Sequence, residues 1–207
     1  MRLRQLIEAT IDCIAQRGYA GTTLAEVADG AGLSRGIVNF HFHSKERLLI
    51  ETLRYLSQVY DRNWREAVKK APASAAARIW AHAKSDFHKS VCNRRYISAW
   101  SGLRAEASSR PTYQKICADS DKACQDYILA QCRQIQKEGD YATDPEIVAL
   151  ALDALTEGLW LQFLMQPDIL TPAKARKCVL AFFAGQYPKH FDRKGPIRQP
   201  GIDGGEG

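Results

Sequence analysis

Apolar residues near the start of the chain recur every three or four positions, which is the pattern of a helix that buries one face. They are Leu3, Leu6, Ile7, Ile11 and Ile14. This helix should end at Gly18, because glycine readily takes the left-handed backbone conformation with which many helices stop. The pattern predicts an amphipathic helix that packs its apolar face against the segments that follow.

The next segment predicts two short helices joined by a tight turn. Thr23 is followed three residues later by a glutamate, the spacing of a capping box, so one helix should cover 24–31. Gly32 suits the turn, because a left-handed backbone there costs glycine little. Ser34 is a typical N-cap for a second helix over 35–42. This is the arrangement of a helix-turn-helix, whose second helix enters the major groove of DNA.

The second helix should have one side turned inward, since Val38, His41 and Phe42 share a face by their spacing. On the other side, an arginine and an asparagine offer groups that pair with guanine and adenine edges. Lys45 follows a capping serine and so lies where a phosphate would meet a helix N-terminus. The candidate DNA contacts are Thr23, Ser34, Arg35, Gly36, Asn39, Phe40, His43 and Lys45. The alternative is an ordinary capped helix pair, which would hold if 35–42 packed inward.

Helical periodicity continues through the rest of the chain, and no run alternates apolar and polar residues as strands do. Proline, glycine and capping residues divide it into helices over 49–69, 74–91, 93–108, 111–137, 145–167 and 172–187. We expect an all-α protein with an N-terminal three-helix helix-turn-helix head, 1–47. A larger helical ligand-binding and dimerisation domain should cover 48–190. The Gly-, Pro- and charge-rich residues 191–207 should form a disordered tail.

The segment 147–165 is apolar around most of its circumference. Such a helix needs cover on two sides, and we expect its own domain to supply one and a second subunit the other. The last helix has Val179, Phe182 and Phe183 on one side, which suits the same interface. The interface would then contain four helices. The alternative is a central helix in a monomeric core. Asp153, Glu157 and Gln162 argue against a membrane span.

The formal net charge of +6 suits a polyanionic partner. No charged-plus-apolar signal segment is present, so we expect a cytoplasmic protein with no membrane role. The six cysteines are dispersed and lack paired metal spacing, so we interpret them as small buried residues, with a thiol redox sensor as the alternative. His82, Asp86 and His88 are too few ligands for a metal site, and we interpret them as surface polar residues. No metal and no other cofactor is expected.

Several motifs in the first quarter of the chain resemble the tetracycline-repressor (TetR) family of bacterial transcription factors. The matching residues are Gly18-Tyr19, Thr22-Thr23, Ala28, Ala31-Gly32, Ser34, Gly36, Phe42, Ser44-Lys45-Glu46 and Leu48-Leu49. The resemblance implies an all-helical homodimer that binds a double-stranded DNA operator and releases it when a small molecule binds the larger domain. One departure is Asn39, because family members usually carry a phosphate-contacting tyrosine there. Asn39 would then contact either a phosphate or a base.

The body is similar to the BetI branch of this family, the repressors of choline-to-betaine genes. Phe87, Trp100 and Pro111 keep that branch's spacing, and 157–161 resembles its Asp-Gly-Leu-Trp segment. The resemblance implies a quaternary ammonium ligand held by aromatic faces. However, Arg104 stands where that branch has an aromatic residue, and an inward Arg104 would favour an anionic ligand; the alternative is that it faces solvent or pairs with an acidic residue. The candidate ligand-binding residues are Phe87, Tyr96, Trp100, Arg104, Trp160 and Phe163.

These patterns favour a ligand-responsive dimeric transcriptional regulator, most simply a repressor, that binds its operator through the helices 24–31 and 35–42. A redox- or metal-responsive regulator with the same head is the first alternative. A small helical enzyme is the second, although no nucleophile–base pair or Gly-rich phosphate loop supports it.

Overall fold

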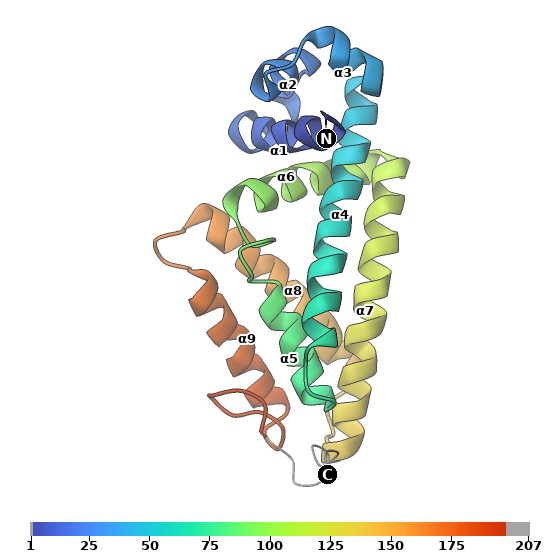
Figure 1. Ribbon diagram of the computed structural model, residues 1–207. Helices are drawn as coiled ribbons and strands as arrows, with labels where there is room; N and C mark the ends of the chain where they lie inside the picture. The colour runs from blue at the N-terminus through green and yellow to red at the C-terminus, as the bar shows by residue number, and fades with distance from the viewer. Residues whose placement is uncertain (1, 198–207) are drawn as a thin grey trace, which may run out of the picture. The chain divides into compact units, whose positions relative to one another are not determined.

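The computed structural model describes residues 2–197, and within that range every regular element is helical (Figure 1). The α-helices are α1 (Arg2–Gly21), α2 (Leu24–Ala31), α3 (Arg35–Phe42), α4 (Lys45–Lys69), α5 (Ala75–Ser85), α6 (Arg94–Ala105), α7 (Pro111–Gly139), α8 (Pro145–Met165) and α9 (Pro172–Gln186). A short 3-10 helix, Glu106–Ser109, follows α6. The prediction of an all-α fold is confirmed.

The described chain forms two compact units, each built from separated stretches of sequence. The first contains the chain up to Tyr60 together with Asn93–Ser120, and the second contains Asp61–Cys92 together with the chain from Asp121 onward. Helices α4 and α7 each contribute to both units. Residue 47 lies inside the first unit, and the division into functional regions 1–47 and 48–190 stays a prediction.

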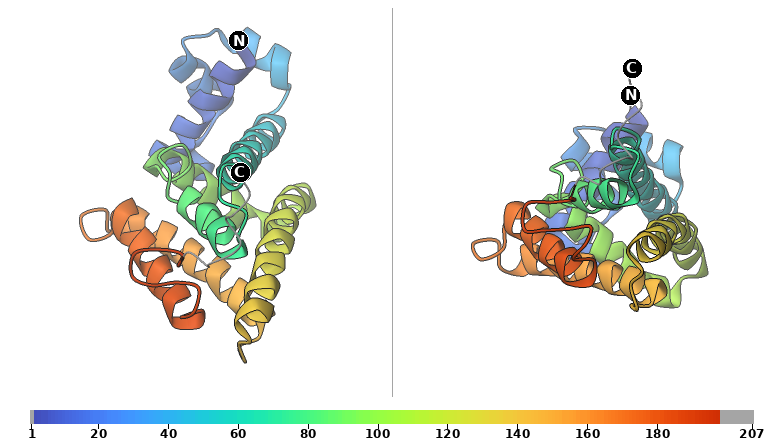
Figure 2. Two further views of the ribbon diagram at one scale, coloured as in Figure 1. Left: turned by 60° about the horizontal axis from the view of Figure 1, so that its bottom comes forward. Right: turned by 90° about the horizontal axis from the view of Figure 1, so that it is seen from below.

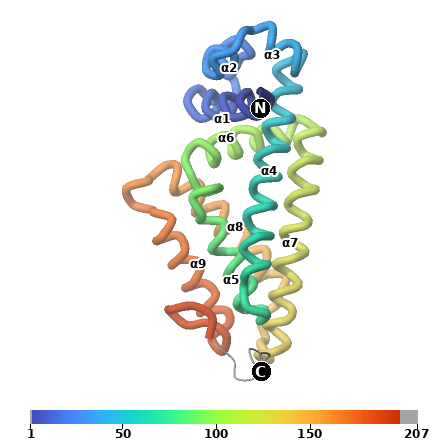
Figure 3. The backbone as a smooth tube through the Cα atoms, in the orientation of Figure 1, coloured from blue at the N-terminus to red at the C-terminus, as the bar shows by residue number. Residues whose placement is uncertain are grey.

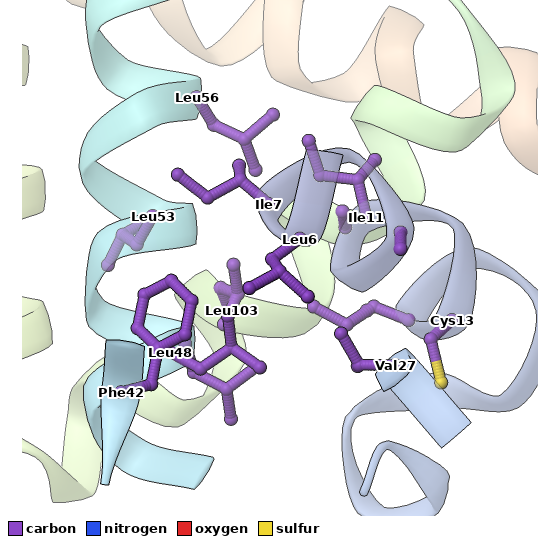
Figure 4. Close-up of a cluster of buried hydrophobic side chains, with 14 of the residues drawn as sticks. Leu6, Ile7, Ile11, Cys13, Val27, Phe42, Leu48, Leu53, Leu56 and Leu103 are labelled. Atoms are coloured by element: carbon purple, nitrogen blue, oxygen red, sulfur yellow. The ribbon is translucent and has the colours of Figure 1, made fainter. Parts of the chain in front are cut away.

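The first unit has a continuous apolar core to which α1, α2, α3, α4, α6 and α7 all contribute (Figure 4). Its buried residues include Leu6, Ile11, Val27, Phe42, Leu48, Leu53, Leu103 and Tyr113. The expected break in α1 is present, because Gly18 has a left-handed φ of 74° and interrupts the helical backbone. The apolar stripe read from the sequence of α1 is therefore the surface on which the neighbouring helices pack.

A polar cluster fastens α6 to α1 within this unit. Glu8 on α1 accepts hydrogen bonds from the hydroxyls of Tyr55 and Tyr96, at 2.8 and 3.2 Å. Arg95 on α6 pairs with Glu8 at 3.1 Å and also with Asp12. Figure 1 places the two helices side by side, and the backbones are in contact along them. Helix α6 is thus part of the compact unit that carries the helix-turn-helix.

The second unit packs α5 against α9 and α8 against α9 (Figure 2). The predicted helix over 74–91 is too long, since α5 ends at Ser85. The next two carbonyl groups are held by side chains from distant helices: Trp160 donates to the Asp86 carbonyl at 2.9 Å, and Arg176 donates to the Phe87 carbonyl at 3.3 Å. These tertiary bonds replace the helical ones, and local sequence does not reveal them.

The segment after α9 turns back on itself rather than trailing away (Figure 3). Phe191 is buried, stacks on Phe183 at 4.8 Å, and forms an isolated bridge with Pro196. The expectation of a disordered tail over 191–207 is therefore wrong for 191–197, because Phe191 completes an apolar cluster in the second unit. Residues 198–207 lie outside the described residues.

Helix α8 keeps much of its apolar surface exposed. Among the described residues it is the one helix long and apolar enough to cross a membrane by length and composition, with a mean hydropathy of 1.5 and only 22% of its most apolar window buried. Length and composition of a single helix are weak grounds for a membrane span. Ile147, Leu150, Leu161 and Met165 are each more than half exposed.

Candidate nucleic-acid interface

The local geometry of the helix-turn-helix follows the capping residues read from the sequence. The Thr23 hydroxyl accepts from the Glu26 amide at 3.2 Å, and the Ser34 hydroxyl accepts from the Ile37 amide at 3.4 Å. Gly32 ends α2 with a left-handed φ of 63°. The Glu26 carboxylate pairs with Arg17 on α1. The predicted helices 24–31 and 35–42 are confirmed.

Helix α3 divides sharply into a buried and an exposed side. Val38 and Phe42 lie in the core of the first unit, whereas Arg35, Gly36, Asn39 and Phe40 are exposed. His41 was expected beside Val38 and Phe42, but it is exposed because it lies at the edge of that face. The side of α3 that the sequence assigned to DNA is therefore accessible.

A groove of about 570 Å³ runs along this exposed side and is open to solvent. It is lined by the N-terminus of α1 and by α3, through Arg2, Leu3, Ser34, Gly36, Ile37, Phe40 and His41. No aspartate or glutamate occurs between Asp29 and Glu46. The stretch that includes α3 thus presents cationic, polar and apolar groups without an opposing carboxylate of its own.

Gly36 and His43 are residue types that their local backbone conformations do not favour. Gly36 has no left-handed φ, and an added Cβ would meet only the Ser34 hydroxyl, at 3.8 Å. Alanine would thus fit there and would favour the helix. His43 ends α3 with a φ of 56°, a conformation that non-glycine residues rarely adopt. Both positions lie in the segment predicted to contact DNA.

Lys45 has an intramolecular role that the sequence did not suggest. Its ammonium donates to the carbonyls of Tyr19 and Ala20, at 3.0 and 3.4 Å, and lies 5.1 Å from the Tyr19 ring centroid. It therefore satisfies carbonyls at the end of α1, beyond the break at Gly18. The Arg110 guanidinium also lies over the Tyr19 ring, 5.5 Å from its centroid. No local signal links positions so far apart in sequence.

The six residues predicted to bind a ligand fall in both units. In the second unit, Phe87 is buried, Trp160 is half-buried at its bond to the Asp86 carbonyl, and Phe163 is half-buried on α8. In the first unit, all on α6, the Tyr96 hydroxyl binds Glu8, and the Arg104 guanidinium lies 5.3 Å from the Trp100 ring centroid. Their common role in binding a ligand stays a prediction.

The interpretation of His82 and Asp86 as surface residues is wrong. Both are buried in the second unit, where His82 Nε2 lies 3.1 Å from Cys124 Sγ and Nδ1 lies 3.7 Å from an Asp86 oxygen. Burial lowers the pKa of His82 to about 4, so this imidazole is neutral near pH 7. His88 is exposed and bonds Ser90. Among residues 2–197 no group of three His, Cys, Asp or Glu side chains is arranged to hold a metal.

The cysteines match the interpretation as small buried residues, with one exception. Cys13, Cys92, Cys117, Cys124 and Cys132 are buried, and Cys178 on α9 is exposed. Burial raises the pKa of the Cys92 and Cys132 thiols to about 11, which keeps them protonated and unreactive near neutral pH.

Comparison with known proteins identifies both parts of the chain. Residues 6–52 match the family of bacterial regulatory proteins of the tetR type, and residues 75–188 match the C-terminal domain of BetI-type transcriptional repressors. The chain belongs to the TetR family of transcriptional regulators. This match confirms the family that the residues around the helix-turn-helix predicted, and it also confirms the BetI branch.

Individual relatives of this TetR-family regulator extend over most of its length. The HTH-type transcriptional regulator BetI of Serratia proteamaculans is 27% identical over 180 residues, covering 84% of this chain and 87% of that protein. A putative transcriptional regulator from Pseudomonas aeruginosa has a similar structure, with a TM-score of 0.78 at 26% identity, covering 92% of this chain and 93% of the other. A putative regulator from Saccharomonospora viridis, solved in complex with choline, shares the fold at 24% identity, with a TM-score of 0.75, covering 87% of this chain and 94% of that one.

Proposed function

We propose that the protein is a dimeric repressor that binds an operator through α2 and α3 and releases it when a small molecule binds. The observation that carries this proposal is the exposed side of α3, on which Arg35, Gly36, Asn39 and Phe40 lie together. Helix α3 is capped, and Val38 and Phe42 pack it against the core. It is therefore a rigid support for side chains that enter a major groove. Its place of action would be the cytoplasm, and catalysis is not part of the proposal.

The contacts divide into two kinds by their chemistry. Arg35 and Asn39 carry the groups that pair with guanine and adenine, and Gly36 lets the helix approach closely. Thr23, Ser34, His43 and Lys45 lie at helix ends, where amides and cations bind phosphate. The Lys45 ammonium has three protons, so it can hold a phosphate as well as the carbonyls of α1.

The second subunit would cover the exposed strip of α8. Ile147, Leu150, Leu161 and Met165 are exposed at spacings that keep them on one side of the helix, with Ala154 and Gly158 between them. Small residues at the centre allow two helices to approach closely. On α9, Val179 and Phe183 are buried, so their predicted place in this interface is wrong, and Ala181 and Gly185 are the exposed residues. A four-helix interface would bury this surface and would set two heads at the spacing of successive major grooves.

Ligand binding would cause release of the operator through a movement of α6. The candidate ligand residues Tyr96, Trp100 and Arg104 lie on α6, and Glu8 and Asp12 bind the same helix to α1. A ligand that shifts α6 would thereby move the helix on which the head is built. Arg104 places a positive charge on the same helix as Tyr96 and Trp100, and a guanidinium attracts an anionic group. We therefore propose a ligand that carries an anionic group, with choline as the second candidate.

The experiment uses DNA from beside the protein's own gene in a fluorescence anisotropy titration at several salt concentrations. We expect specific binding, and we expect Lys45→Ala to reduce the slope of log affinity against log salt by about one per head. Wild-type binding no tighter than to unrelated DNA would overturn the proposed function. Addition of choline or of stearoyl-CoA, the ligand of a related-fold FadR from Bacillus subtilis, then separates a cationic from an anionic effector.

A further inference from the structure

Phe40 is 76% exposed, although phenylalanine is among the most apolar side chains. Helix geometry explains its position, because Val38 and Phe42 turn into the core and the residue midway between them points the opposite way. The exposed ring contributes nothing to the core of the first unit. Its edge-on contact with the neighbouring His41 ring, at 5.4 Å, leaves it accessible.

The surroundings of Phe40 indicate what it meets. The open groove beside it is lined by the apolar residues Leu3 and Ile37, and by Gly36, which lies one turn earlier on the same side of α3. Gly36 leaves space that the fold itself does not use, since an added Cβ would clash with nothing. Arg2 and Arg35 are exposed at the same end of the unit. This is an apolar centre with cations beside it, which suits the floor of a groove between two rows of phosphates.

We propose that Phe40 is a specificity residue that reads thymine through the C5-methyl group. A phenyl ring has no hydrogen-bond donor or acceptor, and the thymine methyl is the one apolar group that base pairs present in the major groove. Gly36 allows the backbone of α3 to approach until the ring touches that methyl. The inference rests on the proposed function, and it adds that each half-site contains a thymine opposite Phe40.

Uracil provides the test, because it pairs as thymine does and lacks only the methyl group. The wild-type protein first selects its preferred duplex from a random pool, and each thymine of the selected half-site is then replaced by uracil. We expect one position at which uracil weakens binding by about fourfold per half-site, roughly fifteenfold for both, from the loss of one buried methyl each. At the other thymines the affinity should not change.

Variants assign this effect to Phe40. Phe40→Ala should bind the thymine and uracil duplexes equally, and Phe40→Leu should keep part of the preference. Arg62→Ala, which removes an exposed side chain of α4 that does not line the groove, should keep the full preference. Circular dichroism checks that each variant retains the helical content of the wild type, as expected for changes at exposed positions.

The outcomes separate the inference from the function on which it rests. Equal binding to thymine and uracil duplexes by the wild type, or an unchanged preference in Phe40→Ala, would overturn the reading of thymine while DNA binding stands. A wild-type protein that selects no sequence from the pool would overturn both.

Discussion

At the scale of single residues, the fold and the proposed function make different demands at the same positions. Gly36 and His43 are the clearest cases, because glycine is unfavourable inside a helix and histidine is unfavourable in a left-handed conformation. Such locally unfavourable choices concentrate at functional sites. They lie on the part of the chain that we propose meets DNA.

Gly36→Ala is expected to stabilise the protein while weakening DNA binding. Alanine favours the helix by about 0.5 kcal/mol over glycine, which should raise Tm by about 1–2 °C for a chain of this size. Its methyl group would occupy the open side of α3 and hold the helix away from the bases, so we expect about tenfold weaker operator binding. Calorimetry and anisotropy measure the two effects.

The matched control is Gly30→Ala on α2, where an added Cβ meets only the Ala9 methyl, at 4.0 Å. It should give a similar gain in stability with no loss of DNA binding. If Gly36→Ala binds operator as well as the wild type does, close approach of α3 at this residue is wrong.

His82 should make the second unit sensitive to acid. Burial lowers its pKa in the folded protein to about 4, while in the unfolded chain it titrates near 6.5. Between these values the unfolded state binds the extra proton, so stability falls as the pH falls. From pH 7 to pH 5 the expected loss from this residue is about 2 kcal/mol.

Urea unfolding of the wild type and of His82→Gln, across pH 4.5–7.5, measures that loss. The variant is less stable near pH 7 because it disturbs a packed site beside Cys124, but its stability should depend less on pH over this range. Parallel curves for the two proteins would mean that His82 is not buried in its neutral form.

At the scale of elements, the attachment of α6 to α1 is the contact through which ligand binding is proposed to reach the helix-turn-helix. Glu8→Ala removes the acceptor for Tyr55, Tyr96 and Arg95 at once. Because these groups are only partly buried, we expect a loss of about 2 kcal/mol in the free energy of unfolding. Glu51→Ala, which breaks the exposed pair with Arg54, is the control and should cost about 0.5 kcal/mol or less. An equal effect of both variants would argue against a fastening role for Glu8.

The boundaries of a helix could be predicted from the sequence where they depend on interactions between neighbouring residues. The capping threonine and serines and Gly32 act within one turn of their own position, so the boundaries of α2 and α3 could be predicted closely. The end of α5 could not, because Trp160 and Arg176 come from α8 and α9. The burial of His82 and Phe191, and the contact between Lys45 and Tyr19, also depend on packing between distant segments.

In the candidate site too, local features could be predicted from the sequence, and contacts between distant segments could not. The exposed side of α3 could be read from helical spacing, whereas the groove beside it needs the N-terminus of α1, which the sequence does not place next to α3. Family resemblance and aromatic character predict the ligand residues, but the partners of these residues, such as Glu8 for Tyr96, come from another helix. Spacing along one helix contains no information about such partners.

At the scale of the whole molecule, the exposed strip on α8 is the feature that a second subunit would explain. Leu161→Glu and Leu150→Glu should each give monomers at micromolar concentration in sedimentation velocity, because a buried unpaired carboxylate is strongly unfavourable. Phe40→Glu is the matched change on the head and should leave the mass of the assembly unchanged. A wild type that sediments as a monomer, or variants that remain dimers, would contradict the proposed interface.

The most direct test of the account is operator binding by Arg35→Glu, compared with Arg62→Glu, which reverses the charge of an exposed arginine on α4. The side of α3 is proposed to enter the major groove, so Arg35→Glu should lose at least about 100-fold in affinity, the sum of a lost base contact and repulsion by phosphates. Arg62→Glu should bind as the wild type does. Equal affinity of both variants and the wild type for the operator would contradict the central claim that α3 is the DNA-reading helix.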